Sequence, residues 1–147
     1  MRILLIEDDD VKADNIKEYL QEINTESSIV RKCSWQSGLI EIISNSNYKM
    51  IVLDMSMPRY DHDSYEFETY AGWDVLKEMK RRNIKIPTTV VTSFDTFGKP
   101  EDMRNIEELN DILWNEFPEF YLGIIRYNSS LVNWKNKLGE LFGGIEE

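Results

Sequence analysis

Short apolar runs alternate along this chain with longer stretches in which apolar residues recur every three or four positions. The first run, residues 2–6, is apolar without a break after its first position, which is typical of a strand buried on both faces of a parallel sheet. Further strands are predicted over residues 28–33, 48–55, 86–93 and 121–127.

Helices are predicted after each of these strands. They cover residues 10–23, a segment capped by Ser34, residues 72–82, residues 100–117, and a last segment from Ser129 or Ser130 to the pair Gly143 and Gly144. In the first helix, Asp10 is the expected N-cap. The expected inward stripe of this helix is Val11, Ile16, Tyr19, Leu20 and Ile23. Five strands alternating with five helices predict an α/β fold, a doubly wound (βα)5 unit around a five-stranded parallel sheet.

Length and composition limit the function classes. A chain of 147 residues is one domain by its size, and no apolar run reaches the roughly 18 to 20 residues that span a bilayer. Since the chain also enters a strand directly after Met1, we expect no targeting peptide, no membrane partner and a cytoplasmic location. The net charge of -10 argues against direct nucleic-acid binding and favours protein partners or a small cation. The single cysteine excludes an intramolecular disulfide.

Acidic residues stand at the ends of two predicted strands. Glu7, Asp8, Asp9 and Asp10 follow the first strand, and Asp54 closes the third. Functional crevices of parallel α/β sheets lie beyond these carboxyl ends, where grouped carboxylates raise each other's pKa values or bind a cation. Such oxygen ligands suit Mg²⁺. The alternative is that water solvates the acids and that Asp9 and Asp10 only cap the helix.

Three segments carry a family resemblance. "ILLIEDDD", "MIVLDMSMP" and "TTVVTS" resemble the signatures of the response-regulator receiver domain, a CheY-like unit of two-component signalling. The resemblance implies the flavodoxin-like strand order 2-1-3-4-5, which places the two acidic strand ends side by side. It also implies phosphoryl transfer to this chain from a histidine kinase or a phosphotransfer protein.

The resemblance assigns roles to individual residues. Asp54 is the expected phosphoryl acceptor, and Thr92 is the switch hydroxyl. Arg126 stands where the family has a lysine and keeps the positive charge in a bulkier form. The implied Mg²⁺ ligands are Glu7, Asp8, Asp54 and the backbone carbonyl of Ser56.

Other positions depart from the family pattern. Gly123 occupies the place of an aromatic switch residue on the fifth strand, where Tyr121 or Tyr127 could substitute or simply pack. Residues 59–71 are an insertion, predicted to form a small β-ribbon from the alternation of Tyr65, Phe67 and Thr69. His62 within it is a solvated loop histidine or a metal ligand.

The helix expected over residues 100–117 is enlarged. It suggests either a dedicated protein partner on the face formed by the fourth helix, fifth strand and fifth helix, or a larger core.

Two functions compete. The first is a stand-alone receiver, switched by Mg²⁺-dependent phosphorylation of Asp54, whose only chemistry is its own phosphorylation and dephosphorylation. The second is a receiver-like adaptor that binds partners without phosphorylation. A phosphatase with a nucleophilic aspartate fits less well, because Ser56 stands where that chemistry needs a second aspartate.

Overall fold

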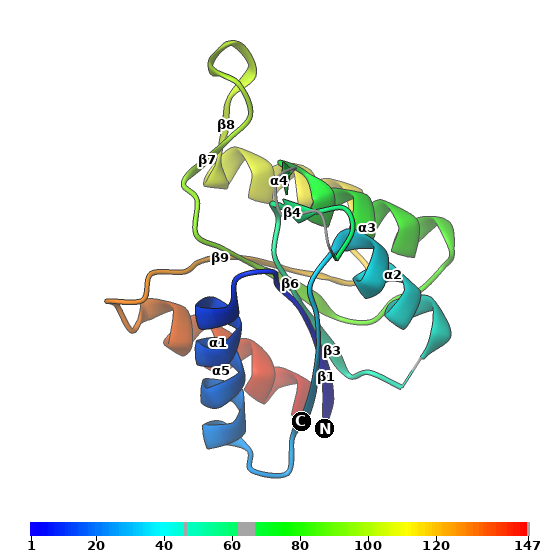
Figure 1. Ribbon diagram of the computed structural model, residues 1–147, viewed down its shortest axis with the longest axis vertical. Helices are drawn as coiled ribbons and strands as arrows, with labels where there is room; N and C mark the ends of the chain where they lie inside the picture. The colour runs from blue at the N-terminus through cyan, green and yellow to red at the C-terminus, as the bar shows by residue number, and fades with distance from the viewer. Residues whose placement is uncertain (46, 62–66, 147) are drawn as a thin grey trace.

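The computed structural model describes residues 1–45, 47–61 and 67–146. Its centre is a parallel sheet with the strand order β2-β1-β3-β6-β9 (Figure 1). The sheet consists of β1 (Arg2–Ile6), β2 (Ser28–Lys32), β3 (Met50–Leu53), β6 (Thr88–Thr92) and β9 (Tyr121–Arg126). Counted along the chain, these strands lie in the order 2-1-3-4-5, so the predicted fold class and topology are confirmed.

Helices cover both faces of the sheet. One face carries α1 (Asp10–Ile23) and α5 (Asn133–Glu146), and the other carries α2 (Trp35–Ser44), α3 (Ala71–Arg81) and α4 (Ile106–Glu116) (Figure 1). Side chains alternate along a strand, so β1 contributes to two separate hydrophobic cores. Ile3 and Leu5 pack toward α1 and α5. Leu4 and Ile6 pack toward the other three helices. Within the described residues, every helix is too short or too polar to cross a bilayer.

Two small antiparallel ribbons stand at the carboxyl edge of the sheet. β4 (Met57–Pro58) pairs with β5 (Phe67–Glu68), so a ribbon forms here as predicted, but its first strand precedes the predicted insertion at residues 59–71. His62 and Tyr65 lie outside the described residues. The second ribbon pairs β7 (Thr96–Phe97) with β8 (Arg104–Asn105) and contains the 3-10 turn η1 (Pro100–Asp102). This second ribbon was not predicted.

The predicted helix over residues 100–117 is wrong at its start, because α4 begins only at Ile106. Pro100 opens a 3-10 turn instead, and Asn105 is the true cap, with its Oδ1 accepting from the Glu108 N–H at 2.9 Å. The cause is tertiary. Phe97 is buried beside Tyr70 of the α3 cap, and the pairing of Phe97 with Arg104 keeps the preceding segment extended.

Two further helix details were also predicted wrongly. Asp9 rather than Asp10 caps α1, with its Oδ1 accepting from the Lys12 N–H at 3.1 Å. The last helix starts at Asn133 and runs past Gly143 and Gly144 to Glu146. Phe142 is buried in the α1–α5 core, so packing outweighs the roughly 1 kcal/mol that each helical glycine costs relative to alanine.

Candidate functional site

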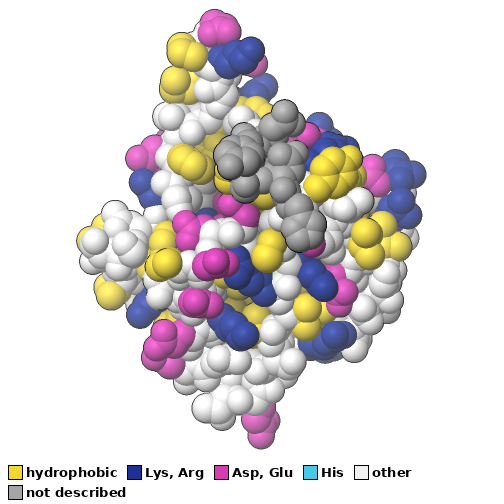
Figure 2. Space-filling view, in the orientation of Figure 1, with side chains coloured by type: hydrophobic (Ala, Val, Ile, Leu, Met, Phe, Trp, Pro, Cys, Tyr) yellow, Lys and Arg dark blue, Asp and Glu magenta, His cyan; other side chains and the backbone are white. Residues whose placement is uncertain are grey.

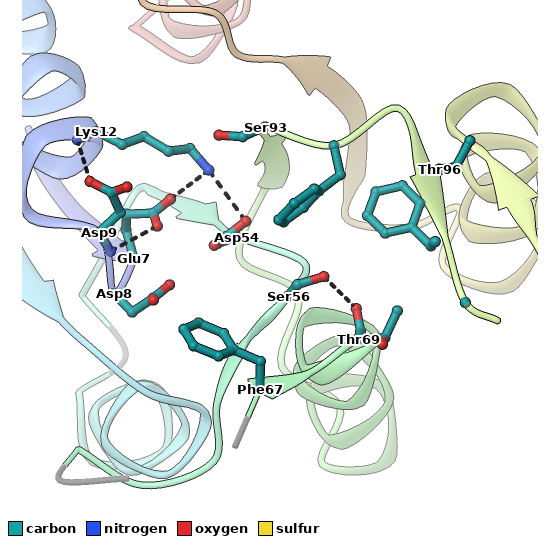
Figure 3. Close-up of a pocket in the computed structure, with 13 residues that line it drawn as sticks. Glu7, Asp8, Asp9, Lys12, Asp54, Ser56, Phe67, Thr69, Ser93 and Thr96 are labelled. Atoms are coloured by element: carbon teal, nitrogen blue, oxygen red, sulfur yellow. Dashed lines mark hydrogen bonds and ion pairs between the residues drawn. The ribbon is translucent and has the colours of Figure 1, made fainter. Parts of the chain in front are cut away.

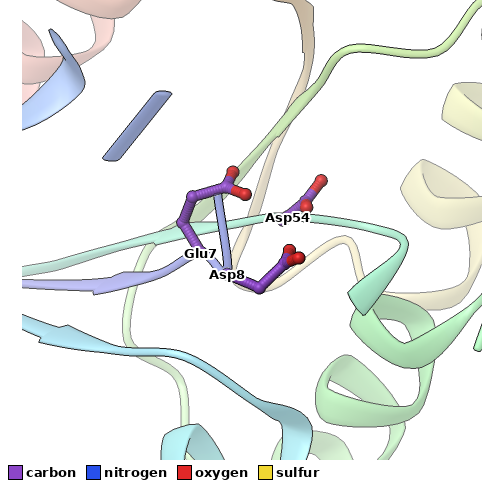
Figure 4. A group of neighbouring side chains, drawn as sticks. All are labelled: Glu7, Asp8 and Asp54. Carbon is purple, nitrogen blue, oxygen red and sulfur yellow. The ribbon is translucent and has the colours of Figure 1, made fainter. Parts of the chain in front are cut away.

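The acids at the two strand ends converge, as predicted. β1 and β3 are neighbours in register, with Ile6 opposite Leu53, so the residues that follow them emerge side by side. The Asp54 N–H donates to the Ile6 carbonyl at 2.9 Å. The carboxylates of Glu7, Asp8 and Asp54 point into one space, and one oxygen from each lies within 4.8 Å of the others (Figure 4).

This carboxylate cluster is strongly desolvated. Glu7 is 1% exposed and Asp54 is 5% exposed, while Asp8 is half-buried. Burial and the charge of Asp54 raise the pKa of Glu7 to about 7. Burial and the charge of Glu7 raise the pKa of Asp8 to about 6, and burial also raises the pKa of Asp54. The cluster therefore attracts a proton or a cation more strongly than exposed carboxylates do.

A lysine that the sequence reasoning missed lies inside the cluster. Lys12 of α1 is 4% exposed, and its Nζ lies 2.7 Å from Glu7 Oε1 and 3.3 Å from Asp54 Oδ1 (Figure 3). The same Nζ donates to the Val91 carbonyl at 2.8 Å. Although burial disfavours its charge, the two carboxylates raise the pKa of Lys12 above its ordinary value. Lys12 is therefore a buried ammonium ion.

The helical phase of α1 contains the signal that could have revealed Lys12. The predicted stripe included Val11 and Ile23, but these residues are 68% and 40% exposed. The buried face instead follows Lys12, Ile16 and Leu20 at intervals of four residues. A lysine on the apolar face of a helix that begins beside four acids is a candidate partner for them.

The main chain around Asp54 is closely packed. The Met55 N–H donates to Asp54 Oδ1 at 2.9 Å, and the Gly72 N–H donates to the Met55 carbonyl at 2.9 Å. A Cβ atom at position 72 would lie 2.5 Å from the Asp54 carbonyl oxygen. Only glycine therefore allows α3 to start this close to the acidic cluster.

We expect Gly72→Ala to destabilise the protein by about 1–3 kcal/mol, because the added methyl forces the Asp54 segment away from α3. Thermal unfolding followed by circular dichroism measures this loss. The matched control is Gly143→Ala in α5, where a Cβ meets no atom within 4 Å and should stabilise the helix slightly. Equal melting temperatures for the two variants would contradict the packing argument.

The acids form the floor of a cleft of about 460 Å³. Phe67 and Thr69 line it on one side, and Ser93 and Thr96 line it on the other (Figure 3). Phe94 and Phe97 also line the cleft. The predicted insertion and the unpredicted β7–β8 ribbon therefore both form the rim of the site. In Figure 2, acidic and basic side chains lie next to one another near the middle of this face.

Ser56 and Thr92 lie at this edge of the sheet in different environments. Ser56 lines the cleft, and its Oγ donates to the Thr69 carbonyl at 2.8 Å. Thr92 is fully buried at the end of β6, where its Oγ1 accepts from the Phe94 N–H at 3.2 Å. The neighbouring Ser93, rather than Thr92, lines the cleft.

Arg126 does not bring its charge to the acids in this structure. Its Nε lies 2.7 Å from Asp95 Oδ1, and a second nitrogen donates to the Tyr127 carbonyl. The hydrogen bond from Arg126 Nε lowers the pKa of the exposed Asp95. Arg126 is not among the residues that line the cleft, which receives its positive charge from Lys12.

The donor set suits a divalent cation. Three carboxylates against one ammonium leave a formal charge of -2 when all are ionised, which one divalent ion neutralises. The ligand atoms are hard oxygens, the type that Mg²⁺ prefers. Burial and the charge of a neighbouring carboxylate also raise the pKa values of Glu7 and Asp8, so both hold protons more tightly than usual.

Comparisons with known proteins find similar proteins over nearly the whole chain. The Detocs response regulatory protein DtcB of Enterobacter cloacae (strain JD6301) is 29% identical over 143 residues, which cover 94% of this chain and 95% of DtcB. The protein y4jR of Sinorhizobium fredii (strain NBRC 101917 / NGR234) is 24% identical over 143 residues, covering 94% of each chain. Among solved structures, the response regulator TrrA of Thermotoga maritima in complex with Mg²⁺-BeF matches with a TM-score of 0.62 at 19% identity, over 95% of this chain and 97% of TrrA.

Residues 3–109, which include the carboxylate cluster, Lys12 and Thr92, match the response regulator receiver domain. Receiver domains of this family typically bind Mg²⁺ at an acidic pocket, and they interact with histidine kinases or phosphotransfer proteins. Because this match spans most of the chain and the fold agrees with it, the chain belongs to the response regulator receiver domain family of two-component systems.

Proposed function

We propose that this protein is a receiver that accepts a phosphoryl group on Asp54 in a Mg²⁺-dependent reaction. The observation that carries the proposal is the position of Asp54, buried at the floor of the cleft among two further carboxylates and one ammonium. The phosphoryl donor is a histidine kinase or a phosphotransfer protein. The phosphorylated form then binds a downstream protein.

The proposed ligands of Mg²⁺ are the carboxylates of Glu7, Asp8 and Asp54 together with the backbone carbonyl of Ser56. When bound, the ion neutralises negative charge as the phosphoryl group transfers. The buried and mutually repelling acids support this assignment. The Mg²⁺-BeF bound to TrrA, which has a similar fold, is consistent with it.

The nucleophile is an oxygen of the Asp54 carboxylate. The Met55 N–H and the Lys12 ammonium both contact Oδ1, so we assign the attack to Oδ2. An Oδ2–phosphorus bond forms while the phosphorus–nitrogen bond of a phosphohistidine donor breaks. The bonding electron pair stays on the departing imidazole nitrogen, and Asp54 becomes an acyl phosphate.

Thr92 is the proposed sensor of this new group. Its hydroxyl lies at the end of β6 next to the cleft and now accepts from Phe94. Turning toward a phosphoryl oxygen, the hydroxyl would donate to it and release the Phe94 N–H. Since Phe94 leads into the β7–β8 ribbon, this exchange would reposition the rim of the cleft.

The proposed output surface is formed by α4, β9 and α5. Trp114 of α4 is 42% exposed and lies over β9, with its ring centroid 5.1 Å from that of Tyr121. Gly123 leaves open space beside it, because an added Cβ there would only reach Trp114 at 4.0 Å. Tyr121 and Tyr127 are both buried and hydrogen-bonded, to Asn110 and Asn15, as packing residues are. Trp114 is therefore the aromatic residue that we assign to partner binding.

Incubation with Mg²⁺ and phosphoramidate should add the mass of one phosphoryl group to the intact protein. Hydroxylamine should remove it, because acyl phosphates react with this nucleophile, and chelation of Mg²⁺ by EDTA should prevent its addition. Intact-protein mass spectrometry measures all three results. No mass gain, together with tryptophan fluorescence that does not respond to Mg²⁺, would overturn the proposal in favour of the adaptor.

A further inference from the structure

We infer that Lys12 is the cation that contacts the phosphoryl group on Asp54, in the role for which the family uses a lysine after its fifth long strand. The inference rests on the proposed function and adds a residue of α1 to the reacting site. In this chain, the positive charge of the site comes from Lys12, near the N-terminus, rather than from a residue after the fifth long strand.

The ammonium of Lys12 is already positioned for this role. Its three N–H groups match three acceptors from three strand ends: Glu7 at 2.7 Å, the Val91 carbonyl at 2.8 Å and Asp54 at 3.3 Å. The contact with Asp54 is the longest of the three. A phosphoryl oxygen can therefore replace Asp54 Oδ1 as an acceptor while the other two contacts keep the ammonium in place.

Other nearby cations of the described chain are engaged elsewhere. Arg126 pairs with Asp95 outside the cleft. Arg31 of β2 donates to the backbone carbonyl of Glu7 at 3.0 Å and to the Asp10 carboxylate at 2.7 Å. Among the described residues that line the cleft, Lys12 is the sole lysine or arginine.

In the unphosphorylated protein, Lys12 compensates the buried carboxylates of Glu7 and Asp54, and loss of one partner of such a pair is destabilising. The rest of the buried helix face consists of Ala13, Ile16 and Leu20, so Lys12 is the one charged residue that α1 buries. Phosphorylation adds roughly -1.5 to -2 of charge to a site that is already acidic. A fixed cation has its largest effect where this charge develops.

The test is Lys12→Met, which removes the charge and keeps an unbranched apolar side chain. We expect two effects of opposite sign. The Mg²⁺ affinity, measured by titration of tryptophan fluorescence, should rise severalfold because a repelling cation is lost. The initial rate of phosphorylation by phosphoramidate at saturating Mg²⁺ should fall by about tenfold or more.

Three further variants sharpen the result. Lys17→Met is the matched control, because it makes the same substitution on the same helix outside the cleft, and it should change neither quantity. Lys12→Arg keeps the charge and should recover part of the rate. Arg126→Met removes the cation at the family's usual position and should slow phosphorylation less than Lys12→Met does.

The outcomes separate this inference from the proposed function. If the wild type is phosphorylated and Lys12→Met reacts within about twofold of its rate, or if Arg126→Met shows the larger loss, the inference is overturned and the proposed function stands. A parallel fall of Mg²⁺ affinity and rate in Lys12→Met and Lys12→Arg alike would reduce Lys12 to a structural residue. A wild type that accepts no phosphoryl group overturns both.

Discussion

The Asp54→Asn variant is expected to accept no phosphoryl group under conditions that phosphorylate the wild type. An amide is not a nucleophile for phosphorus. The other two carboxylates of the cluster, Glu7 and Asp8, do not accept the Met55 N–H hydrogen bond that Asp54 accepts. Intact-protein mass spectrometry after incubation with Mg²⁺ and phosphoramidate measures the result. The expected loss is complete, which makes this the largest effect of any substitution considered.

Two controls accompany this variant. Asp74→Asn on α3 changes a half-buried carboxylate whose ion-pair partner within the described part of the chain is Lys77, at 3.9 Å, and should be phosphorylated like the wild type. Without metal, Asp54→Asn should unfold at a temperature no lower than the wild type, because it removes one of three crowded negative charges. A phosphoryl group on Asp54→Asn, located by peptide mass spectrometry at Glu7 or Asp8, would contradict the assignment.

The metal-free protein is expected to lose stability as the pH rises from about 5.5 to about 7.5. In the folded protein, burial and the charge of Asp54 raise the pKa of Glu7 to about 7, so the folded state binds this proton more tightly than the unfolded chain does. This stabilising contribution is fully present below the ordinary pKa of a glutamate and is lost as the pH rises through about 7. The expected loss is on the order of 2 kcal/mol.

Asp8 contributes in the same direction, because its pKa is raised to about 6. Glu78 and Asp95 do not oppose the trend, since arginine partners lower their pKa values and both stay ionised throughout this range. Thermal unfolding in EDTA at a series of pH values gives the measurement. A metal-free melting temperature that rises over this interval would rule out the electrostatic account of the cluster.

Mg²⁺ should reverse this pH dependence. An ion that binds only the folded state stabilises it, and it binds best when the carboxylates are ionised, so its effect should grow with pH. Glu7→Gln is the informative variant, because it keeps an oxygen acceptor for Lys12 and removes the titrating group. Its metal-free stability should vary less with pH than that of the wild type, and its response to Mg²⁺ should be weaker.

Local chemistry made several elements predictable. The bounds of β1 and α1 match the predicted ranges, since an apolar run and an amphipathic repeat depend only on nearby residues. Ser34 caps α2 as expected, because the Ser34 side chain and the Ser37 N–H belong to one short segment. The convergence of Glu7, Asp8 and Asp54 was also predictable, because carboxyl ends of adjacent parallel strands meet at one edge of the sheet.

The start of α4 shows where local chemistry was insufficient. Pro100 and the apolar residues after it fit a helix as well as they fit a 3-10 turn. The pairing of β7 with β8 and the packing of Phe97 beside Tyr70 stabilise the ribbon instead of a longer helix. The second contact joins residues that are distant along the chain.

The sequence by itself determined the fold class, the family and the acidic residues at the two strand ends, because these follow from local periodicity and from short motifs. Only the tertiary structure decided which cation reaches the acids. Lys12 and Arg126 carry the same charge. The helical phase of α1 marks Lys12 as a candidate partner of the acids, but no local pattern shows that Arg126 pairs with Asp95 instead. The packed position of α1 against the sheet turns Lys12 inward to Glu7 and Asp54, while the end of β9 leaves Arg126 beside Asp95.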